Sequence, residues 1–240
     1  MQNISVENLF LIDIETVSCC EKYELLTDSW KELWTQKIYK LLPENTTAEE
    51  YYPHRAGIMA EFAKVVCISI GYLKNENDNM QLRIKSFYSE NEKEILEKFI
   101  ETVCQLHAVN NKWCFTGHNI KEFDIPFLCR RILVNNISIP DCFNFQAMKP
   151  WDVPVLDTLH LWRFGDYKHY TSLKLLAATL GVPSPKDDID GSMVSEVYWK
   201  EKDLKRIAVY CQKDVATVAN IVLRFKNLPL LKEEQIKYVV

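Results

Sequence analysis

The order in which extended and helical patterns follow one another is the feature of this sequence that most constrains its fold. Three apolar runs with the composition of β-strands come first, and a short polar turn separates the last two. We expect them to pair as an antiparallel meander that begins a sheet. The three runs are Leu9–Ile14, Lys64–Leu73 and Gln81–Tyr88.

The pattern changes after the third run. Apolar residues recur at helical spacing between Asn91 and His107, and a strand-like run at Lys112–Thr116 and a second helical stretch at Ile125–Val134 follow. Pro126 suits the first turn of that second helix. Because an alternation of strand and helix implies parallel strands, we predict an α/β fold with a mixed sheet. An antiparallel meander precedes parallel strands in this sheet, and helices flank it.

The remainder of the chain is predicted to be helical, and Asp157 is expected to cap the first of its helices. The helices are expected around Thr158–Arg163, Ser172–Leu180, Ser192–Trp199 and Lys202–Phe225.

The length of 240 residues and the apolar content of 48% fit one domain that spans residues 1–240. The stretch from about residue 19 to residue 59 is longer than a tight connection between strands. Because Trp30–Leu42 within it has a helical pattern, we predict a helical insertion at 19–59.

Charge and cysteine content limit the class of protein. The net charge of −4 argues against a general nucleic-acid coating protein, which needs many Lys and Arg contacts to phosphates. The first apolar run has no basic region before it and stops at Asp13, which fits neither a signal peptide nor a membrane span. Eight cysteines without a C-x-x-C pair favour a reducing cytoplasmic location.

The first motif with chemical meaning is Asp13-Ile14-Glu15-Thr16, at the end of the first predicted strand. Side chains two residues apart on a strand point to the same side, so the two carboxylates are suited to hold metal ions between them. The alternative is a polar strand end that runs into a turn.

The second motif is His118-Asn119 followed by Phe123-Asp124, between the fourth strand and its helix. Ligand groups in α/β sheets lie in such loops, at the carboxyl ends of strands. Asp124 stands directly before Ile125 and Pro126, so an N-cap of the helix is the alternative.

The third motif is Tyr210-Cys211-Gln212-Lys213-Asp214 in the last predicted helix. Tyr210 and Asp214 are four residues apart and therefore share a face, beside an apolar stripe that includes Cys211 and Val215. The alternative is a half-buried tyrosine at the core margin with a solvated Asp214.

The three motifs gain meaning as a set. Asp13, Glu15, Asp124 and Asp214 can converge at one end of the sheet if the last helix packs across it. Four carboxylates that close would repel one another without cations. Two Mg²⁺ or Mn²⁺ ions would remove this repulsion and clamp the attacking and leaving oxygens of a phosphodiester.

In this order the motifs resemble the DEDD superfamily of 3′-5′ exonucleases, which has a ribonuclease H-like (DnaQ-like) fold, and the tyrosine marks the DEDDy branch. The layout from Leu9 to about Phe225 is similar to the exonuclease domain of family B DNA polymerases. It is most similar to stand-alone bacterial proteins predicted to be related to that domain.

This resemblance implies a two-metal-ion hydrolysis of terminal phosphodiester bonds that releases nucleoside 5′-monophosphates. It makes Asp13, Glu15, Asp124 and Asp214 the metal ligands and Tyr210 the residue that orients the attacking water. An unperturbed tyrosine is a poor base at neutral pH, so orientation is the favoured role. The residues implied to contact the terminal nucleotides are Ile14, Thr16, Asn119 and Phe123.

Single-stranded DNA is the favoured substrate. The alternatives are RNA, since the same chemistry acts on either sugar, and a catalytically silent nucleic-acid binding module. No membrane partner is expected, and the sequence identifies no protein partner. His118 and His169 could assist at the site, although a polar loop histidine is usually a surface residue. Arg163, Lys168, Lys174 and Lys186 could guide a strand toward the metals or form only a solvated face.

Overall fold

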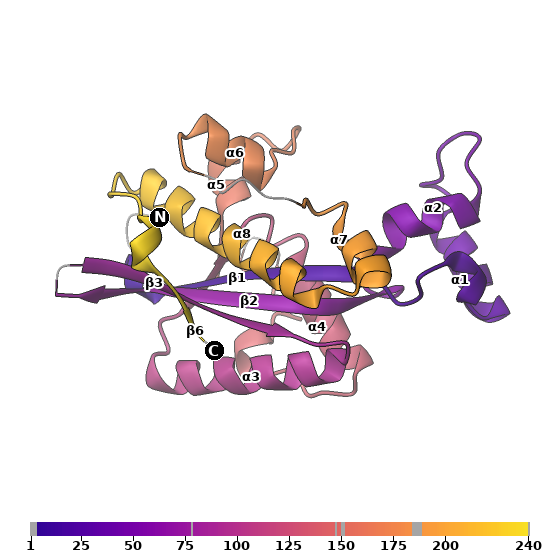
Figure 1. Ribbon diagram of the computed structural model, residues 1–240, viewed down its shortest axis with the longest axis horizontal. Coiled ribbons are helices and arrows are strands. Elements are labelled where there is room, and N and C mark those ends of the chain that lie inside the picture. The colour runs from indigo at the N-terminus through magenta and orange to yellow at the C-terminus, as the bar shows by residue number, and fades with distance from the viewer. Residues whose placement is uncertain (1–3, 78, 147, 150–151, 184–188, 240) are drawn as a thin grey trace.

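A six-stranded mixed sheet in the order β5-β4-β1-β2-β3-β6 forms the centre of the molecule (Figure 1). The computed structural model describes residues 4–77, 79–146, 148–149, 152–183 and 189–239. The strands are β1 (Leu9–Ser18), β2 (Ala63–Glu76), β3 (Asn79–Tyr88), β4 (Cys114–Gly117), β5 (Val155–Asp157) and β6 (Ile236–Val239).

The strand pairing confirms the predicted order of the sheet. β1 pairs with β2 and β2 with β3 in antiparallel fashion, whereas β4 pairs with β1 and β5 with β4 as parallel strands. Because β1 and β4 are parallel neighbours, their carboxyl ends lie at the same edge of the sheet. The α/β fold class predicted from the sequence is correct.

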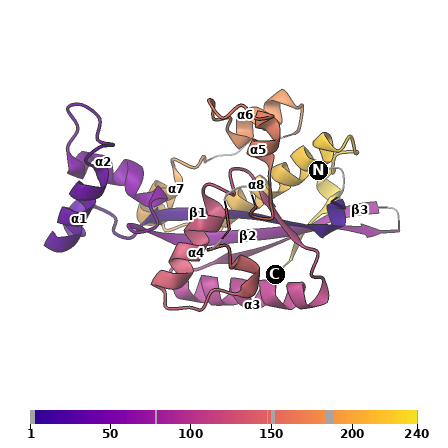
Figure 2. The ribbon, with the colours of Figure 1, turned by 180° about the vertical axis from the view of Figure 1, so that it is seen from behind.

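Helices cover both faces of this sheet. Figures 1 and 2 show α3 and α4 on one face, and α8 crossing the other face with α5 and α6 beside it. The helices are α1 (Asp28–Ile38), α2 (Ala48–Arg55), α3 (Glu92–Val109), α4 (Asp124–Val134), α5 (Thr158–Arg163), α6 (Leu173–Thr179), α7 (Val194–Glu196) and α8 (Leu204–Phe225), with a π turn at Val197–Glu201 after α7.

Each face of β1 belongs to a different part of the core. Phe10, Ile12 and Ile14 pack into the apolar cluster between the sheet and helices α3 and α4, whereas Leu11 packs against α8. Side chains alternate across a strand, so the odd-numbered residues that follow Leu11 also point toward α8. The fold thus directs the D-x-E motif to the face that α8 crosses.

The prediction that the whole chain after α4 is helical is wrong, because β5 and β6 lie in this region. β5 has three residues and runs directly into α5, and β6 has four, so both are too short to show a period in the sequence. Asp157 caps α5 as predicted, since its side chain accepts hydrogen bonds from the backbone N–H groups of Leu159 and His160.

The segment at 19–59 contains α1 and also α2, which was not predicted. Figure 1 shows both helices beyond the end of β1 and β2. They have a small apolar cluster of their own, in which Trp34 is fully buried and its indole N–H donates to the carbonyl of Ala48 at 2.8 Å. Thr47 and Glu50 form a capping box at the start of α2, a signal that is present in the sequence.

All eight cysteines have free thiols. Among the described residues, no helix has both the length and the apolar character that a membrane crossing requires.

Candidate active site

Asp13 and Glu15 lie on β1 on the side of the sheet that α8 covers. Glu15 is buried, and Asp13 is half-buried. Their strand neighbour Ile14 points the opposite way, into the core beneath α4. The two carboxylates therefore share one face, as predicted from their spacing.

Asp124 is the first residue of α4, and Phe123 holds the N-cap position without a capping hydrogen bond from its side chain. The Asp124 Oδ1 atom instead accepts a hydrogen bond at 3.2 Å from the backbone N–H of Ile14, the residue between the two strand carboxylates. This bond joins the start of α4 to β1 and places a third buried carboxylate beside the D-x-E motif. The N-cap alternative for Asp124 is therefore not the observed arrangement.

α8 contributes the remaining groups of the site. Tyr210 and Asp214 lie one turn apart on its margin, and the buried Cys211 between them faces β1. The Cys211 thiol donates to Asp13 Oδ2 at 3.1 Å. One ligand atom each from Asp13, Glu15 and Cys211 lie within 4.8 Å of one another. Sequence reasoning placed Cys211 in the apolar stripe and missed this contact, although its position next to Tyr210 is a usable signal.

Gly71 explains how α8 comes this close to the sheet. It lies on β2 opposite Leu11 of β1, and a Cβ atom built on it would stand only 2.8 Å from Cγ1 of Val215. Only glycine leaves room for the helix residue next to Asp214. The close approach brings Asp214 toward the carboxylates on β1.

The four carboxylates and Tyr210 line one cavity of about 530 Å³. Of the metal ligands, Tyr210 and nucleotide contacts implied by the resemblance, Thr16 alone is absent from its walls. The Thr16 hydroxyl donates to the carbonyl of Gly57 at 2.6 Å. The predicted residues that line the cavity are Asp13, Ile14, Glu15, Asn119, Phe123, Asp124, Tyr210 and Asp214.

Burial and mutual repulsion dominate the electrostatics of this cavity. Burial raises the pKa of Asp13, and the charges of Asp214 and Asp124 raise it further. The pKa of Glu15 is raised by burial and by Asp13. Burial raises the pKa of Asp124 to about 7, although backbone N–H groups donate to its carboxylate. A cation bound among these groups would favour their charged forms, so the arrangement suits a divalent metal ion.

Tyr210 has a pKa well above its usual range, because burial and the neighbouring charges of Asp214 and Glu15 disfavour the phenolate. Its hydroxyl therefore keeps its proton at neutral pH. A protonated phenol can orient a water molecule through hydrogen bonds.

Asp157 fixes the loop that carries the second motif. In addition to capping α5, its carboxylate accepts hydrogen bonds from the backbone N–H groups of Asn119 at 3.0 Å and Lys121 at 3.1 Å. Asn119 adopts a left-handed backbone conformation with φ of 60°. Its side-chain oxygen is buried and accepts no hydrogen bond within the described part of the chain.

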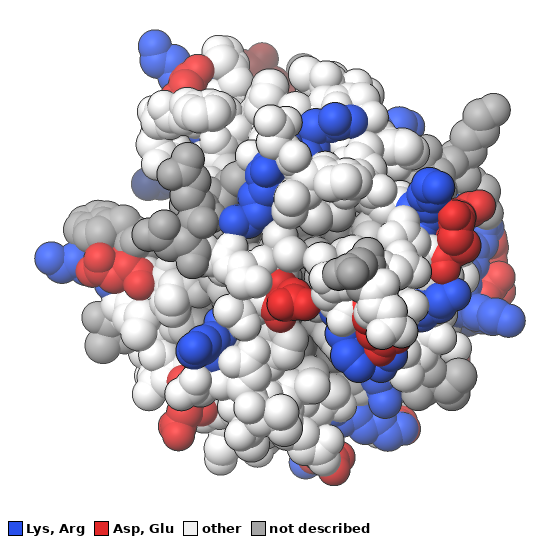
Figure 3. Space-filling view, turned by 90° about the vertical axis from the view of Figure 1, so that its left-hand side faces the viewer, with Lys and Arg blue, Asp and Glu red and all other residues white. Residues whose placement is uncertain are grey.

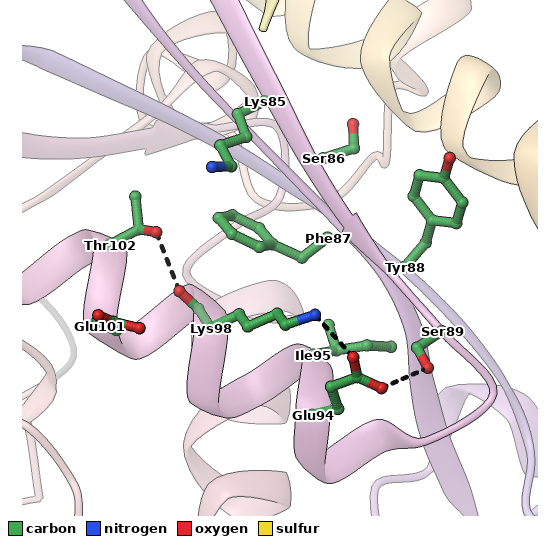
Figure 4. A pocket seen from close by; sticks show the side chains of 10 residues that line it. All are labelled: Lys85, Ser86, Phe87, Tyr88, Ser89, Glu94, Ile95, Lys98, Glu101 and Thr102. Carbon is green, nitrogen blue, oxygen red and sulfur yellow. Dashed lines mark hydrogen bonds and ion pairs between the residues drawn. The ribbon is translucent and has the colours of Figure 1, made fainter. Parts of the chain in front are cut away.

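A second hollow, of about 370 Å³, lies on the other side of the sheet between β3 and α3 (Figure 4). Among its lining side chains, Glu94 accepts hydrogen bonds from Lys98 at 2.7 Å and from Ser89 at 3.0 Å. None of the predicted site residues lines it. Figure 3 shows basic and acidic side chains interspersed over one face of the molecule, consistent with the small net charge.

The architecture is that of the ribonuclease H-like exonuclease domains found in family B DNA polymerases. The family B DNA polymerase of the hyperthermophilic archaeon Pyrobaculum calidifontis matches with a TM-score of 0.53 and 14% identity. The match covers 90% of this chain and 24% of the polymerase chain, so the present chain spans about a quarter of that protein. No curated protein matches the sequence.

Residues 58–235 match a family model described as a predicted 3′-5′ exonuclease related to the exonuclease domain of PolB. The chain belongs to this family. The matched residues include Asp124, Tyr210 and Asp214, whereas Asp13 and Glu15 precede them. The geometry of β1 is therefore what links the D-x-E motif to the other two motifs.

Proposed function

We propose that this protein is a metal-dependent 3′-5′ exonuclease that shortens single-stranded DNA and releases nucleoside 5′-monophosphates. The observation that carries this proposal is the convergence of Asp13, Glu15, Asp124 and Asp214 in one cavity with Tyr210. These side chains come from β1, α4 and α8, elements far apart in the chain. We further propose that residues 1–240 form a single exonuclease domain with a helical insertion at 19–59.

Two Mg²⁺ or Mn²⁺ ions fit the donor set of this cavity. Hard oxygen ligands suit both ions, and the buried carboxylates raise one another's pKa, a cost that cations would remove. When bound, such ions would supply charge stabilisation for the attacking and leaving oxygens. Asp13, Glu15, Asp124 and Asp214 are the proposed ligands.

The remaining side chains orient the reactants. The hydrolysis forms a bond between phosphorus and a water oxygen and breaks the bond to the 3′ oxygen, which leaves as a hydroxyl on the shortened strand. Tyr210 is proposed to hold the attacking water through its protonated hydroxyl. Phe123 and Asn119 are proposed to contact the terminal nucleotide, and the unsatisfied Asn119 Oδ1 fits an incoming hydrogen-bond donor.

The test uses single-stranded DNA labelled at its 5′ end, with Mg²⁺ or Mn²⁺. We expect a ladder that shortens from the 3′ end and is lost in the Asp214→Asn variant. Asp28→Asn is the matched control, because the Asp28 side chain is fully exposed on α1. Absence of shortening by folded protein with either metal would refute the proposal and favour a silent binding module. A matched RNA strand decides between the two sugars.

A further inference from the structure

Three large aromatic side chains are exposed in the loop between α5 and α6. Phe164 is 91% exposed, Tyr167 is 67% exposed and Tyr170 is 63% exposed. They recur every third residue. We call residues 164–172 the aromatic loop, and it lies on the face of the sheet that α8 crosses (Figure 1). Exposed aromatic rings at such a density mark a binding surface more often than an inert one.

We propose that the aromatic loop is the track along which an unpaired 3′ end enters the carboxylate cavity, with successive bases stacked on Tyr170 and Tyr167. This inference rests on the proposed exonuclease function and adds the surface that holds the single strand outside the cavity. Proteins that bind single strands without sequence preference combine stacking platforms with basic side chains along the backbone path.

Tyr170 forms the inner end of the track. It lines the same cavity as Asp13, Asp124 and Asp214 while most of its surface remains exposed. Its ring meets the imidazole of His118 edge to face, with centroids 6.4 Å apart and an interplanar angle of 70°. A base that stacks on this ring would therefore lie next to the nucleotide in the cavity.

His118 fixes the backbone beside Tyr170. Its Nε2 atom lies 2.9 Å from the carbonyl oxygen of Thr171 and its Nδ1 atom 2.9 Å from the hydroxyl of Thr158. Because a carbonyl only accepts, Nε2 carries a proton and donates to Thr171. His118 thus acts as a positioning residue that ties the loop to the start of α5, and the ring of Tyr170 is held in place before a strand arrives.

Tyr167 forms the next platform outward. The Arg163 guanidinium lies 5.5 Å from the centre of its ring, and the His160 ring meets it edge to face at 5.9 Å. Arg163 is held in turn by Glu122, which accepts from Nη1 at 3.0 Å. These two contacts fix the orientation of the ring, while the exposed part of Tyr167 offers surface to a base.

The charge of the loop complements that of the cavity. A strand that approaches the cavity is repelled by its five carboxylates, which include Asp190. Lys168 in the aromatic loop and Lys174 in the first turn of α6 lie beside this path, and the loop has one acidic residue, Asp166. Lys174 lines the cavity itself. Basic groups at the entrance therefore offset the repulsion that the phosphates meet. Lys186, also considered a guide, lies outside the described residues.

Stacking requires bases whose faces are free, so the track selects single strands and discriminates little between DNA and RNA. The test is anisotropy of a fluorescently labelled oligothymidylate, measured in EDTA so that binding is independent of hydrolysis. The variants are Tyr167→Ala and Tyr170→Ala. Tyr167→Phe and Tyr170→Phe keep the rings, and Tyr39→Ala removes an exposed ring at the end of α1.

We expect each loop alanine variant to weaken binding by roughly 5- to 150-fold, the range for loss of one stacked base. The phenylalanine variants and Tyr39→Ala should bind like the wild type. An oligonucleotide with abasic sites next to its 3′ terminal nucleotide should bind the wild type as weakly as the alanine variants. A paired, blunt 3′ end should also bind weakly.

Equal binding by the wild type and the alanine variants, or no binding by the wild type, would overturn the track. So would binding to anionic vesicles that depends on Tyr167 while the oligonucleotide stays unbound. Weakened binding in the alanine variants without any strand shortening by the wild type would support the track and refute the exonuclease. Strand shortening by the wild type together with unchanged binding in the alanine variants would support the exonuclease and refute the track.

Discussion

At the scale of single residues, the carboxylates of the candidate site lower the stability of the metal-free fold. Burying a carboxylate without a cation is unfavourable, and three carboxylates in this cavity have pKa values raised by burial and by neighbouring carboxylates. A cluster that served the fold alone would gain by replacing a carboxylate with an amide. The arrangement therefore indicates selection for binding rather than for stability.

The pH dependence of stability tests this cost. In the folded, metal-free protein Asp124 keeps its proton up to about pH 7, whereas in the unfolded chain it titrates near 3.8. Between these values the folded state binds more protons, so the free energy of unfolding falls as the pH rises. Asp124→Asn keeps an acceptor for the Ile14 N–H group and removes this titration.

Denaturant unfolding in EDTA at about pH 5 and about pH 8 measures the effect. The free energy of unfolding should fall by about 1–4 kcal/mol more in the wild type than in Asp124→Asn over this interval. Equal decreases in the free energy of unfolding of the two proteins would show that the folded state does not raise the pKa of Asp124.

Tyr210→Phe removes one hydroxyl and keeps the ring in the core margin. If the hydroxyl orients the attacking water, kcat should fall roughly 10²-fold while KM changes little. Steady-state kinetics on a single-stranded substrate give both values, and Tyr39→Phe is the control. A variant with wild-type kcat would remove Tyr210 from the mechanism.

At the scale of elements, the sequence predicts the helices and strands that are long enough to show an apolar pattern. It misses short strands that depend on pairing with a neighbouring strand. α3, α4 and α8 have clear apolar faces, and β1 to β3 have strand composition, so all of them were predicted within a few residues. β5 and β6 exist because an adjacent parallel strand accepts them, which no local pattern encodes. α2 contains Pro53 and has only Tyr52 buried, so its apolar period is weak.

A buried ion pair between Glu92 and Arg131 connects α3 to α4. Arg131 donates to Glu92 through Nε at 2.8 Å and Nη2 at 2.6 Å, and Glu92 also accepts from the backbone N–H of Val65 on β2. Arg131→Met would leave the buried Glu92 carboxylate without its cationic partner, which should lower the free energy of unfolding by about 3–5 kcal/mol.

Lys98→Met is the matched control, because its ion pair with Glu94 is exposed on α3. That change should cost less than about 1 kcal/mol. Chemical denaturation of both variants checks the contrast. Equal costs would mean that the buried pair does not hold α3 and α4 to the sheet.

At the scale of the whole molecule, convergence is the property that the sequence alone could not establish. The motifs predict the identity of the site residues by resemblance, but no spacing in the chain shows that α8 crosses β1 at Asp13. The crossing depends on Gly71, whose missing side chain lets Val215 approach β2. The Thr16 hydroxyl donates to the Gly57 carbonyl and Thr16 does not line the cavity, so its contact with the terminal nucleotide stays a prediction.

Gly71→Ala tests the dependence of the site on this approach. The added methyl would meet Cγ1 of the stiff Val215 side chain at 2.8 Å and should displace α8, with a loss of stability of about 1–3 kcal/mol. Strand shortening should fall more than stability does, because Asp214 moves with the helix. Gly57→Ala, where the new atom meets only ordinary contacts, should change neither activity nor stability appreciably.

Equilibrium titration with Mn²⁺ by calorimetry tests the convergence of the carboxylates most directly. The wild type and Asp28→Asn should bind the ion with the same affinity, and both Asp13→Asn and Asp214→Asn should weaken that binding at least tenfold while remaining folded. Mn²⁺ binding that is absent from the folded wild type, or unchanged when either Asp13 or Asp214 is replaced, would contradict a shared metal site between β1 and α8.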